Sequence, residues 1–330
     1  MRRRKNGGLL AVLMFFFLMT GLVLGMIIIH IVDEKNSSAK IEALKEELKE
    51  AKIEQEKPIN VYFPKRTIKT GEIQKNSYIQ ENFVIEDGFM AYYNENGEKI
   101  SHVGIDLSYH NQKVDWDALE SSPVEFVMLR CGYRGTTEGG LIEDEKFREY
   151  AEEALSRGYK LGVYFFSQAI SEPEAIAEAD FVIDIINEYD ISYPVAFDTE
   201  LSEDSRVEEA ELSKEEQTNI CIAFLERIKK AGYYPMVYAS ENWFRRRLEV
   251  DRLSEYDFWA PQYLEQNDFL YDFTIWQYTE NGAAPGVEGA CDIDISLVDY
   301  ASFVPSLREA VLSGGEIGEY SDMTPNIMLQ

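Results

Sequence analysis

The chain has 330 residues, of which 45% are hydrophobic and 13% aromatic, so it can bury a substantial core and is not a wholly disordered protein. Its formal net charge of −28 argues against nucleic acid as a partner, because no useful basic stretch exists beyond the N-terminus. With three histidines and no H-E-x-x-H motif, a zinc hydrolase is not expected, and neither a metal nor a cofactor is predicted.

The N-terminus resembles a membrane anchor. Residues 1–8 are basic, and residues 9–32 form an uncharged, apolar run of 24 residues. At about 1.5 Å per residue, a helix of this length spans a hydrocarbon core of roughly 30 Å. A cleaved signal peptide has a shorter apolar region and a small-residue cleavage site, which this run lacks. The sequence predicts a single-pass signal anchor in the cell membrane, with residues 1–8 in the cytoplasm and the remaining chain outside.

Residues 33–99 are interpreted as a helical spacer and linker. Apolar residues at 41, 44, 48 and 51 follow a 3-4-3 spacing, which suits either a short coiled coil or a solvated, charged helix. From residue 59 the chain is polar, and "FMAYYNENGEKI" at 89–100 has the composition of a small hairpin. We therefore expect the folded domain at 100–312, followed by a tail at 313–330.

Beyond residue 100, short apolar strands alternate with amphipathic helices. The strands are predicted to begin near Val103, Phe126, Lys160, Tyr193, Pro235, Phe258, Phe273 and Ala290. Helices are predicted at 143–157, 172–188, 213–231 and 241–248. Ser213 with Glu216 forms a capping box, and Gly158 and Gly232 stand where helices should end. The last strands are too close together for crossover helices, so the spacing predicts an α/β barrel that lacks its last helices.

Polar residues follow these strands at the end of the barrel where such folds place their active sites. They are Asp106, Arg130, Gln168, Asp198, Glu200, Gln262, Gln277 and Asp292. Asp198 and Glu200 project from one face of a strand, and two acids so close raise at least one pKa. Acids, amides and aromatic residues together suit a neutral, polyhydroxylated ligand such as a sugar.

Several segments resemble glycoside hydrolase family 25, the N-acetylmuramidases or lysozymes. They are "GIDLSYHNQKVDW", "VMLRCGYR", "GVYFFSQA", "YPVAFDTE", "PMVYASENWF", "FWAPQY", "IWQYT" and "CDIDISLVDYASF", in the family's order over residues 104–312. The resemblance implies a flattened TIM-like barrel of the (β/α)5(β)3 type. It also implies hydrolysis of the β-1,4 bond between N-acetylmuramic acid and N-acetylglucosamine in peptidoglycan.

The resemblance also implies the site residues. Carried over by position, the catalytic acids are Glu200, Asp198, Asp106 and Asp292. The family usually has asparagine at the position of Asp294, so the choice between Asp292 and Asp294 stays open. Glu200 is expected to be the general acid with Asp198 assisting. The implied substrate-binding residues are Tyr164, Tyr238, Trp259, Gln262, Tyr263, Trp276 and Gln277, although barrel packing alone could account for Tyr164 and Tyr238.

The main alternative is a catalytically silent scaffold that binds peptidoglycan at the membrane, which would not need the Asp198–Glu200 pair. A chitinase-like barrel is disfavoured because its D-x-x-D-x-D-x-E motif is missing. "CGYRGTTEGG" lacks the Lys-Ser/Thr of a phosphate-binding loop, so no nucleotide is expected. The expected partners are glycan strands and, through residues 9–32, the cell membrane. Trp116 and Phe126 are expected in the core, with Asp115 and Asp117 capping a helix.

Overall fold

The computed structural model describes residues 60–61, 75–202, 205–314 and 316–317. The predicted basic tail, the predicted membrane anchor, most of the spacer and most of the C-terminal tail lie outside these residues. In the described part of the chain, no helix combines the length and the apolar character that crossing a membrane requires.

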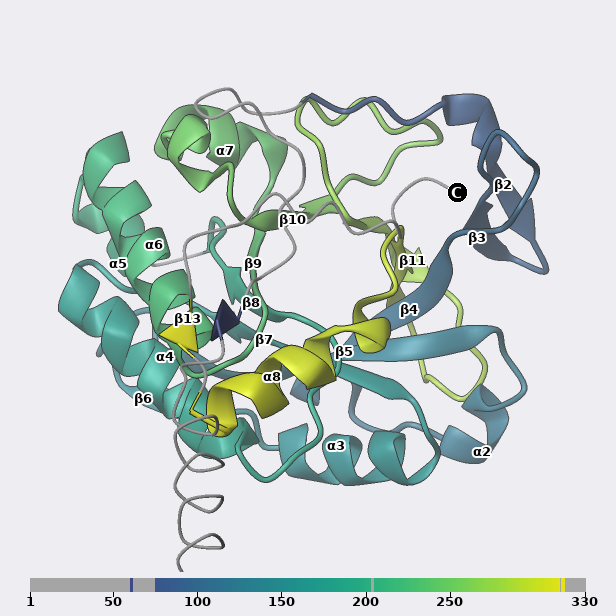
Figure 1. Ribbon diagram of the computed structural model, residues 1–330, viewed down its shortest axis with the longest axis horizontal. Helices are drawn as coiled ribbons and strands as arrows, with labels where there is room; N and C mark the ends of the chain where they lie inside the picture. The colour runs from purple at the N-terminus through teal and green to yellow at the C-terminus, as the bar shows by residue number, and fades with distance from the viewer. Residues whose placement is uncertain (1–59, 62–74, 203–204, 315, 318–330) are drawn as a thin grey trace, which may run out of the picture. The chain divides into compact units, whose positions relative to one another are not determined.

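Eight strands form a closed barrel (Figure 1). In chain order they are β4 (His102–Leu107), β5 (Val124–Arg134), β7 (Lys160–Phe166), β8 (Val195–Asp198), β9 (Pro235–Tyr238), β10 (Asp257–Pro261), β11 (Ile275–Gly282) and β12 (Cys291–Ser296). Each pairs with the next, and β12 returns to β4 to close the ring. All these pairs are parallel except β11–β12 and β12–β4. A short strand, β6 (Leu141–Glu143), extends the sheet beside β5.

Helices follow the first five barrel strands and lie outside the ring (Figure 1). They are α2 (Trp116–Leu119), α3 (Phe147–Ser156), α4 (Glu172–Ile186), α6 (Lys214–Lys230), which the short α5 (Arg206–Glu209) precedes, and α7 (Glu241–Arg247). No α-helix separates β10, β11 and β12 in the described chain. The order is therefore five βα units and then three strands, which confirms the predicted barrel.

Short elements complete the fold. The 3-10 turns are η1 (Gln80–Asn82), η2 (Tyr109–Asn111), η3 (Val250–Leu253) and η4 (Tyr300–Ser302). A last helix, α8 (Val304–Leu312), follows η4, and β1 (Asn60–Val61) pairs in parallel with β13 (Glu316–Ile317).

The helix ends follow local sequence rules. Ser213 and Glu216 form the predicted capping box at the start of α6. Gly158 and Gly232 have positive φ angles just after α3 and α6, which confirms them as helix-terminating positions. Asp115 caps α2 by accepting a hydrogen bond from the backbone N–H of Ala118. Asp117 does not cap this helix, because its carboxylate pairs with Arg157.

The barrel interior is filled by side chains from alternate positions of the strands. Phe126, Met128, Met236 and Ile275 are buried there in one cluster, while residues between them along the strands pack against the helices. Gly104 allows the Phe126 ring to cross the barrel, because a Cβ at residue 104 would lie 2.1 Å from that ring. Phe126 and Trp116 are buried, as the sequence predicts.

The floor of the barrel, at the N-terminal ends of its strands, is closed by a hydrogen-bonded cluster. Tyr234 and Tyr300 both donate from their hydroxyl groups to Asp257 Oδ2, over 3.0 and 2.6 Å. Val304, at the start of α8, packs into the same cluster. The described residues of this cluster thus close the end of the barrel opposite the acids.

A hairpin at 83–92, within the segment that is predicted to be linker, packs on the barrel. Its strands are β2 (Phe83–Glu86) and β3 (Phe89–Tyr92), and β3 is buried along its length. Tyr78, just before the hairpin, donates a hydrogen bond to the carbonyl oxygen of Phe273 over 2.8 Å. The folded region that carries the barrel therefore includes residues from at least 75 onward.

Candidate active site

Four predicted acids lie at the open rim of the barrel. Asp106 is near the end of β4, Asp198 ends β8, and Glu200 follows two residues later. Asp292 reaches the same rim from the beginning of β12, because β12 is antiparallel to β4 and places Asp292 opposite Asp106. Three separate strands thus bring the implied catalytic acids to one end of the barrel.

The Asp198–Glu200 pair has the raised pKa values that the sequence predicts, although the causes differ. Burial raises the pKa of Asp198 well above its usual value, and the charge of Glu200 raises it further. Burial also raises the pKa of Glu200 to about 7, aided by Asp292 rather than chiefly by Asp198. The pair therefore holds at least one proton near neutral pH. Glu200 is only half-buried, so it is the member that a ligand can reach.

Gln277 is the centre of a hydrogen-bonded network beneath the rim. Its Nε2 donates to Asp106 Oδ2 over 2.7 Å. Its Oε1 accepts from the hydroxyl groups of Tyr238, over 2.9 Å, and Tyr263, over 2.7 Å. Both lone pairs of the amide oxygen are thus occupied, which fixes the orientation of the amide. Gln277 therefore positions Asp106 from below the rim.

Aromatic side chains line one side of the site. The rings of Tyr238 and Trp259 meet edge to face at 4.7 Å, and Tyr164 contacts Trp259 at 5.8 Å. Trp259 is buried and donates from Nε1 to Asp294 Oδ1 over 2.8 Å. Tyr263, which is 43% exposed, and half-buried Tyr164 are the rings that a sugar could touch.

Two implied substrate-binding residues do not join the acids. Trp276 is fully buried on the outer face of β11, where its ring lies 5.1 Å from Phe83. Its Nε1 donates to the carbonyl oxygen of Gln262 over 2.8 Å. The side-chain amide of Gln262 in turn donates to Asp268. Trp276 points outward because side chains alternate along a strand, and its neighbour Gln277 points into the barrel.

The two acids of β12 have different environments. Asp292 is partly exposed at the rim, and burial raises its pKa to about 6. Asp294 lies two residues deeper, is 0% exposed, and contacts Asp106 and Trp259. A ligand at the rim can therefore reach Asp292, while Asp294 supports the site from below.

Arg130 is a cation that the sequence predicts at the rim, and the resemblance to family 25 assigns it no role. Its Nε donates to Asp144 Oδ2 over 2.8 Å, and its guanidinium lies 4.9 Å above the Tyr109 ring. The positive charge opposes the rise in the pKa of both Asp198 and Glu200. Asp144 comes from the loop after β6, and no sequence signal links it to Arg130.

Gln168 supports the loop after β8. It is fully buried, and its Oε1 accepts from the hydroxyl of Ser205 over 2.9 Å. Its side-chain amide also contacts the hydroxyl of Ser202 at 3.4 Å. Gln168 lies at the predicted rim, and there it stabilises the segment that follows Glu200.

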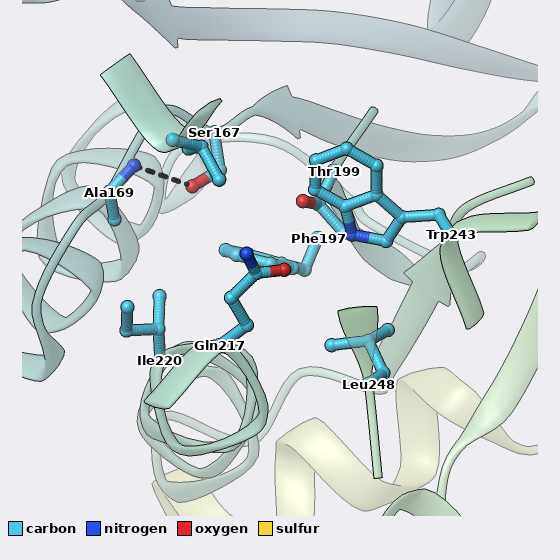
Figure 2. Close-up of a pocket in the computed structure, with 9 residues that line it drawn as sticks. Ser167, Ala169, Phe197, Thr199, Gln217, Ile220, Trp243 and Leu248 are labelled. Atoms are coloured by element: carbon cyan, nitrogen blue, oxygen red, sulfur yellow. Dashed lines mark hydrogen bonds between the residues drawn. The ribbon is translucent and has the colours of Figure 1, made fainter. Parts of the chain in front are cut away.

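A small cavity lies behind the acid pair, outside the barrel (Figure 2). Thr199, between the two acids, lines it together with Phe197 of β8, Gln217 of α6 and Trp243 of α7. About 10 Å³ is open to the centre of a water molecule, which is room for one water. Neither polar atom of the Gln217 side-chain amide, nor Trp243 Nε1, has a hydrogen-bond partner among the described residues. The cavity is too small for a sugar.

Among the described residues, no group of three or more His, Cys, Asp and Glu side chains is arranged to hold a metal ion. The rim carries carboxyl groups, amides, phenols and the guanidinium of Arg130.

Comparison with known proteins gives a consistent result. A sequence model of the glycosyl hydrolases family 25 matches residues 105–287. The modular autolysin LytC from Streptococcus pneumoniae is 26% identical, with a TM-score of 0.52, and the match covers 65% of this chain and 52% of that one. The chain therefore spans about half the length of LytC.

Two further relatives span different shares of their own length. A family 25 glycosyl hydrolase from Bacillus anthracis is 19% identical, with a TM-score of 0.52, over 66% of this chain and 98% of that chain. An autolytic lysozyme from Clostridium acetobutylicum is 21% identical over 215 residues, which is 65% of this chain and 58% of that protein.

Proposed function

The chain belongs to glycosyl hydrolase family 25 and is a lysozyme-type glycoside hydrolase, and we propose that it cleaves peptidoglycan. The proposed bond is the β-1,4 linkage between N-acetylmuramic acid and N-acetylglucosamine. The observation that carries the proposal is the half-buried Glu200 beside Asp198, at a rim that also presents Asp106 and Asp292.

The relatives support peptidoglycan as the substrate class. LytC was also solved in complex with a synthetic peptidoglycan ligand, in a structure that is 25% identical to this chain with a TM-score of 0.50. The exposed ring of Tyr263 and the half-buried ring of Tyr164 provide faces on which a sugar can stack, next to carboxyl groups that bind hydroxyl groups.

We assign the general acid to Glu200. Glycoside hydrolysis needs a carboxylic acid that is still protonated at the working pH and can reach the leaving oxygen. Glu200 fits both needs, because its pKa is raised to about 7 and its side chain is only half-buried. Asp198, two residues before it, assists, and Asp106 and Asp292 add negative potential where positive charge develops on the sugar.

The localisation is part of the same proposal. We take residues 9–32 as a single-pass anchor in the cell membrane, with the barrel on the wall-facing side, because the basic residues 2–5 precede an uncharged span. Protease treatment of intact cells tests this arrangement. Digestion of the barrel without cell rupture is expected, and a mature N-terminus beyond residue 25 would contradict the anchor.

The function is tested by digestion of purified peptidoglycan, followed by mass spectrometry of the products. Fragments with N-acetylmuramic acid at the reducing end are expected. Binding to the glycan without any cleavage would instead indicate the silent scaffold, and fragments with reducing N-acetylglucosamine would show that another bond is cut.

A further inference from the structure

Three carboxyl groups form a row at the junction of β4 and β12. Asp106 is within hydrogen-bonding reach of both Asp292 and Asp294. Asp106 is 4% exposed and Asp294 is 0% exposed, so water solvates little of either group. Arg130, the cation at this rim, pairs with Asp144 instead. The deepest contact in the row, between Asp106 and Asp294, therefore joins two buried acids, and no cation among the described residues balances them.

The donors around these two carboxyl groups leave one contact unexplained. Asp106 Oδ2 accepts from Gln277 and Asp294 Oδ1 accepts from Trp259 Nε1. As a carboxylate oxygen, Asp294 Oδ2 has no donor among the described residues. Two carboxylates cannot hydrogen-bond to each other, since both are acceptors only. The contact between Asp106 and Asp294 is a hydrogen bond only if one of them carries a proton.

We propose that Asp106 and Asp294 share one proton at neutral pH, and that Asp294 acts as a positioning residue for Asp106. Sharing a proton leaves a single negative charge on the pair, where two buried charges in contact would repel. The shared proton and the Gln277 amide then hold Asp106 from two sides. The role of Asp106 in catalysis rests on the proposed function, whereas the proton itself does not.

The electrostatics of the surroundings agree with this arrangement. Burial raises the pKa of both Asp106 and Asp294, and the charge of Asp292 raises each further. The hydrogen bonds from Gln277 and Trp259 act in the opposite direction. Burial raises the pKa of the other titratable groups that face the pair, and the charge of Asp106 or Asp294 raises each of them further. These groups are Tyr164, Tyr238, Tyr263, Tyr278 and Cys291.

The proton can be observed without substrate. Infrared spectra of the protein with isotope-labelled aspartate should show a protonated-carboxyl band at neutral pH that disappears in Asp294→Asn. The mirror variant Asp106→Asn should lose the same band, because either asparagine can donate to the remaining carboxylate. Asp257→Asn is the control, since Asp257 is a buried acid at the barrel floor that accepts from two tyrosines, and this variant should keep the band.

Stability gives a second readout. The folded pair keeps a proton that free aspartates lose above pH about 4, so wild-type stability should fall as pH rises from there through the raised pKa of the pair. Asp294→Asn lacks this proton. The melting temperature of the variant minus that of the wild type should therefore increase between pH 4 and 8.

Activity tests the positioning role. The amide of Asp294→Asn can still donate to Asp106, so this variant should hydrolyse peptidoglycan at least about tenfold faster than Asp294→Ala, as expected for one hydrogen bond to a charged group. Equal loss in the two variants, or a band unchanged in both Asp294→Asn and Asp106→Asn, would overturn the proposal. A wild-type protein that does not cut peptidoglycan would refute the proposed function, while the spectra and melting curves would still decide the proton.

Discussion

Asp292 and Asp106 lie directly opposite each other across the antiparallel pair β12–β4. In a barrel of parallel strands, only the C-terminal end of each strand reaches the catalytic rim. Because β12 runs in the opposite direction, its first residues reach that rim instead. The reversal of one strand therefore adds Asp292 at the rim and Asp294 just below it.

Replacing Glu200 with glutamine should abolish hydrolysis and leave the fold intact. The amide has the same shape but cannot supply a carboxyl proton, and general acid catalysis contributes about 10²–10⁴-fold. The loss should appear in product release from purified peptidoglycan, while sedimentation with the glycan should be retained. Glu145→Gln, at an exposed position, is the matched control. Near-normal turnover of Glu200→Gln would mean that another group is the acid.

The pH dependence of hydrolysis should report Glu200. The rate should fall as pH rises through about 7, because the general acid loses its proton there. Asp292→Asn removes a negative charge that raises the pKa of Glu200, so the alkaline limb should move to lower pH. Arg130→Gln removes a positive charge that lowers this pKa, so the limb should move to higher pH.

These two shifts are measured as the pH dependence of kcat/KM. Arg148→Gln serves as the control for charge removal, because Arg148 forms ion pairs on the outer surface. Shifts of Asp292→Asn and Arg130→Gln in the same direction would show that Glu200 does not set the limb.

A protein that starts at residue 75 should be more stable than one that starts at residue 100. The longer chain keeps Phe89, Met90 and Tyr92, which are buried in the main core. Burial of each large apolar side chain contributes roughly 1.5–3 kcal/mol, so the shorter chain should melt lower by roughly 10 °C or more. Calorimetry of both proteins measures this, and equal melting temperatures would show that the hairpin packs without stabilising the barrel.

The cavity behind Thr199 should contain an ordered water. A water bound there can accept from Trp243 Nε1 and bond to the Gln217 amide, which otherwise have no partner among the described residues. A high-resolution crystal structure should show its density next to both groups. Density should weaken in Gln217→Leu, and a dry cavity in the wild type would contradict this expectation.

Much of the fold is predictable because its signals are local. Apolar strand runs, the capping box at Ser213 and the terminating glycines depend on a few neighbouring residues. The strand intervals alone indicate a barrel without its last helices. The hairpin at 83–92 is harder to predict, since its polar flanks resemble a linker and its Phe83 meets Trp276 of the barrel only after folding.

The site is predictable in its acids and less so in its amides. An acid directly after an apolar strand is unusual enough in a sequence to indicate a function. An amide gives no indication of which groups it will hydrogen-bond in the folded protein. Gln277 is engaged by Tyr238, Tyr263 and Asp106, and two of these are far away in the chain. The resemblance places Trp276 in the site, whereas strand alternation predicts its outward orientation, because an inward-pointing Gln277 requires an outward-pointing neighbour.

The closure of the ring by β4 and β12 also bears on when the protein becomes active during its synthesis. Asp106 and Gln277, which hydrogen-bond directly, are 171 positions apart in the chain, and the strand that closes the barrel ends only at Ser296. Contacts of such separation form late, because the intervening chain must be synthesised and ordered first. A nascent chain that has emerged as far as Glu200 carries the acid pair without Asp292 or the Gln277 amide. The complete site therefore forms only after the chain has been made and folded through Ser296.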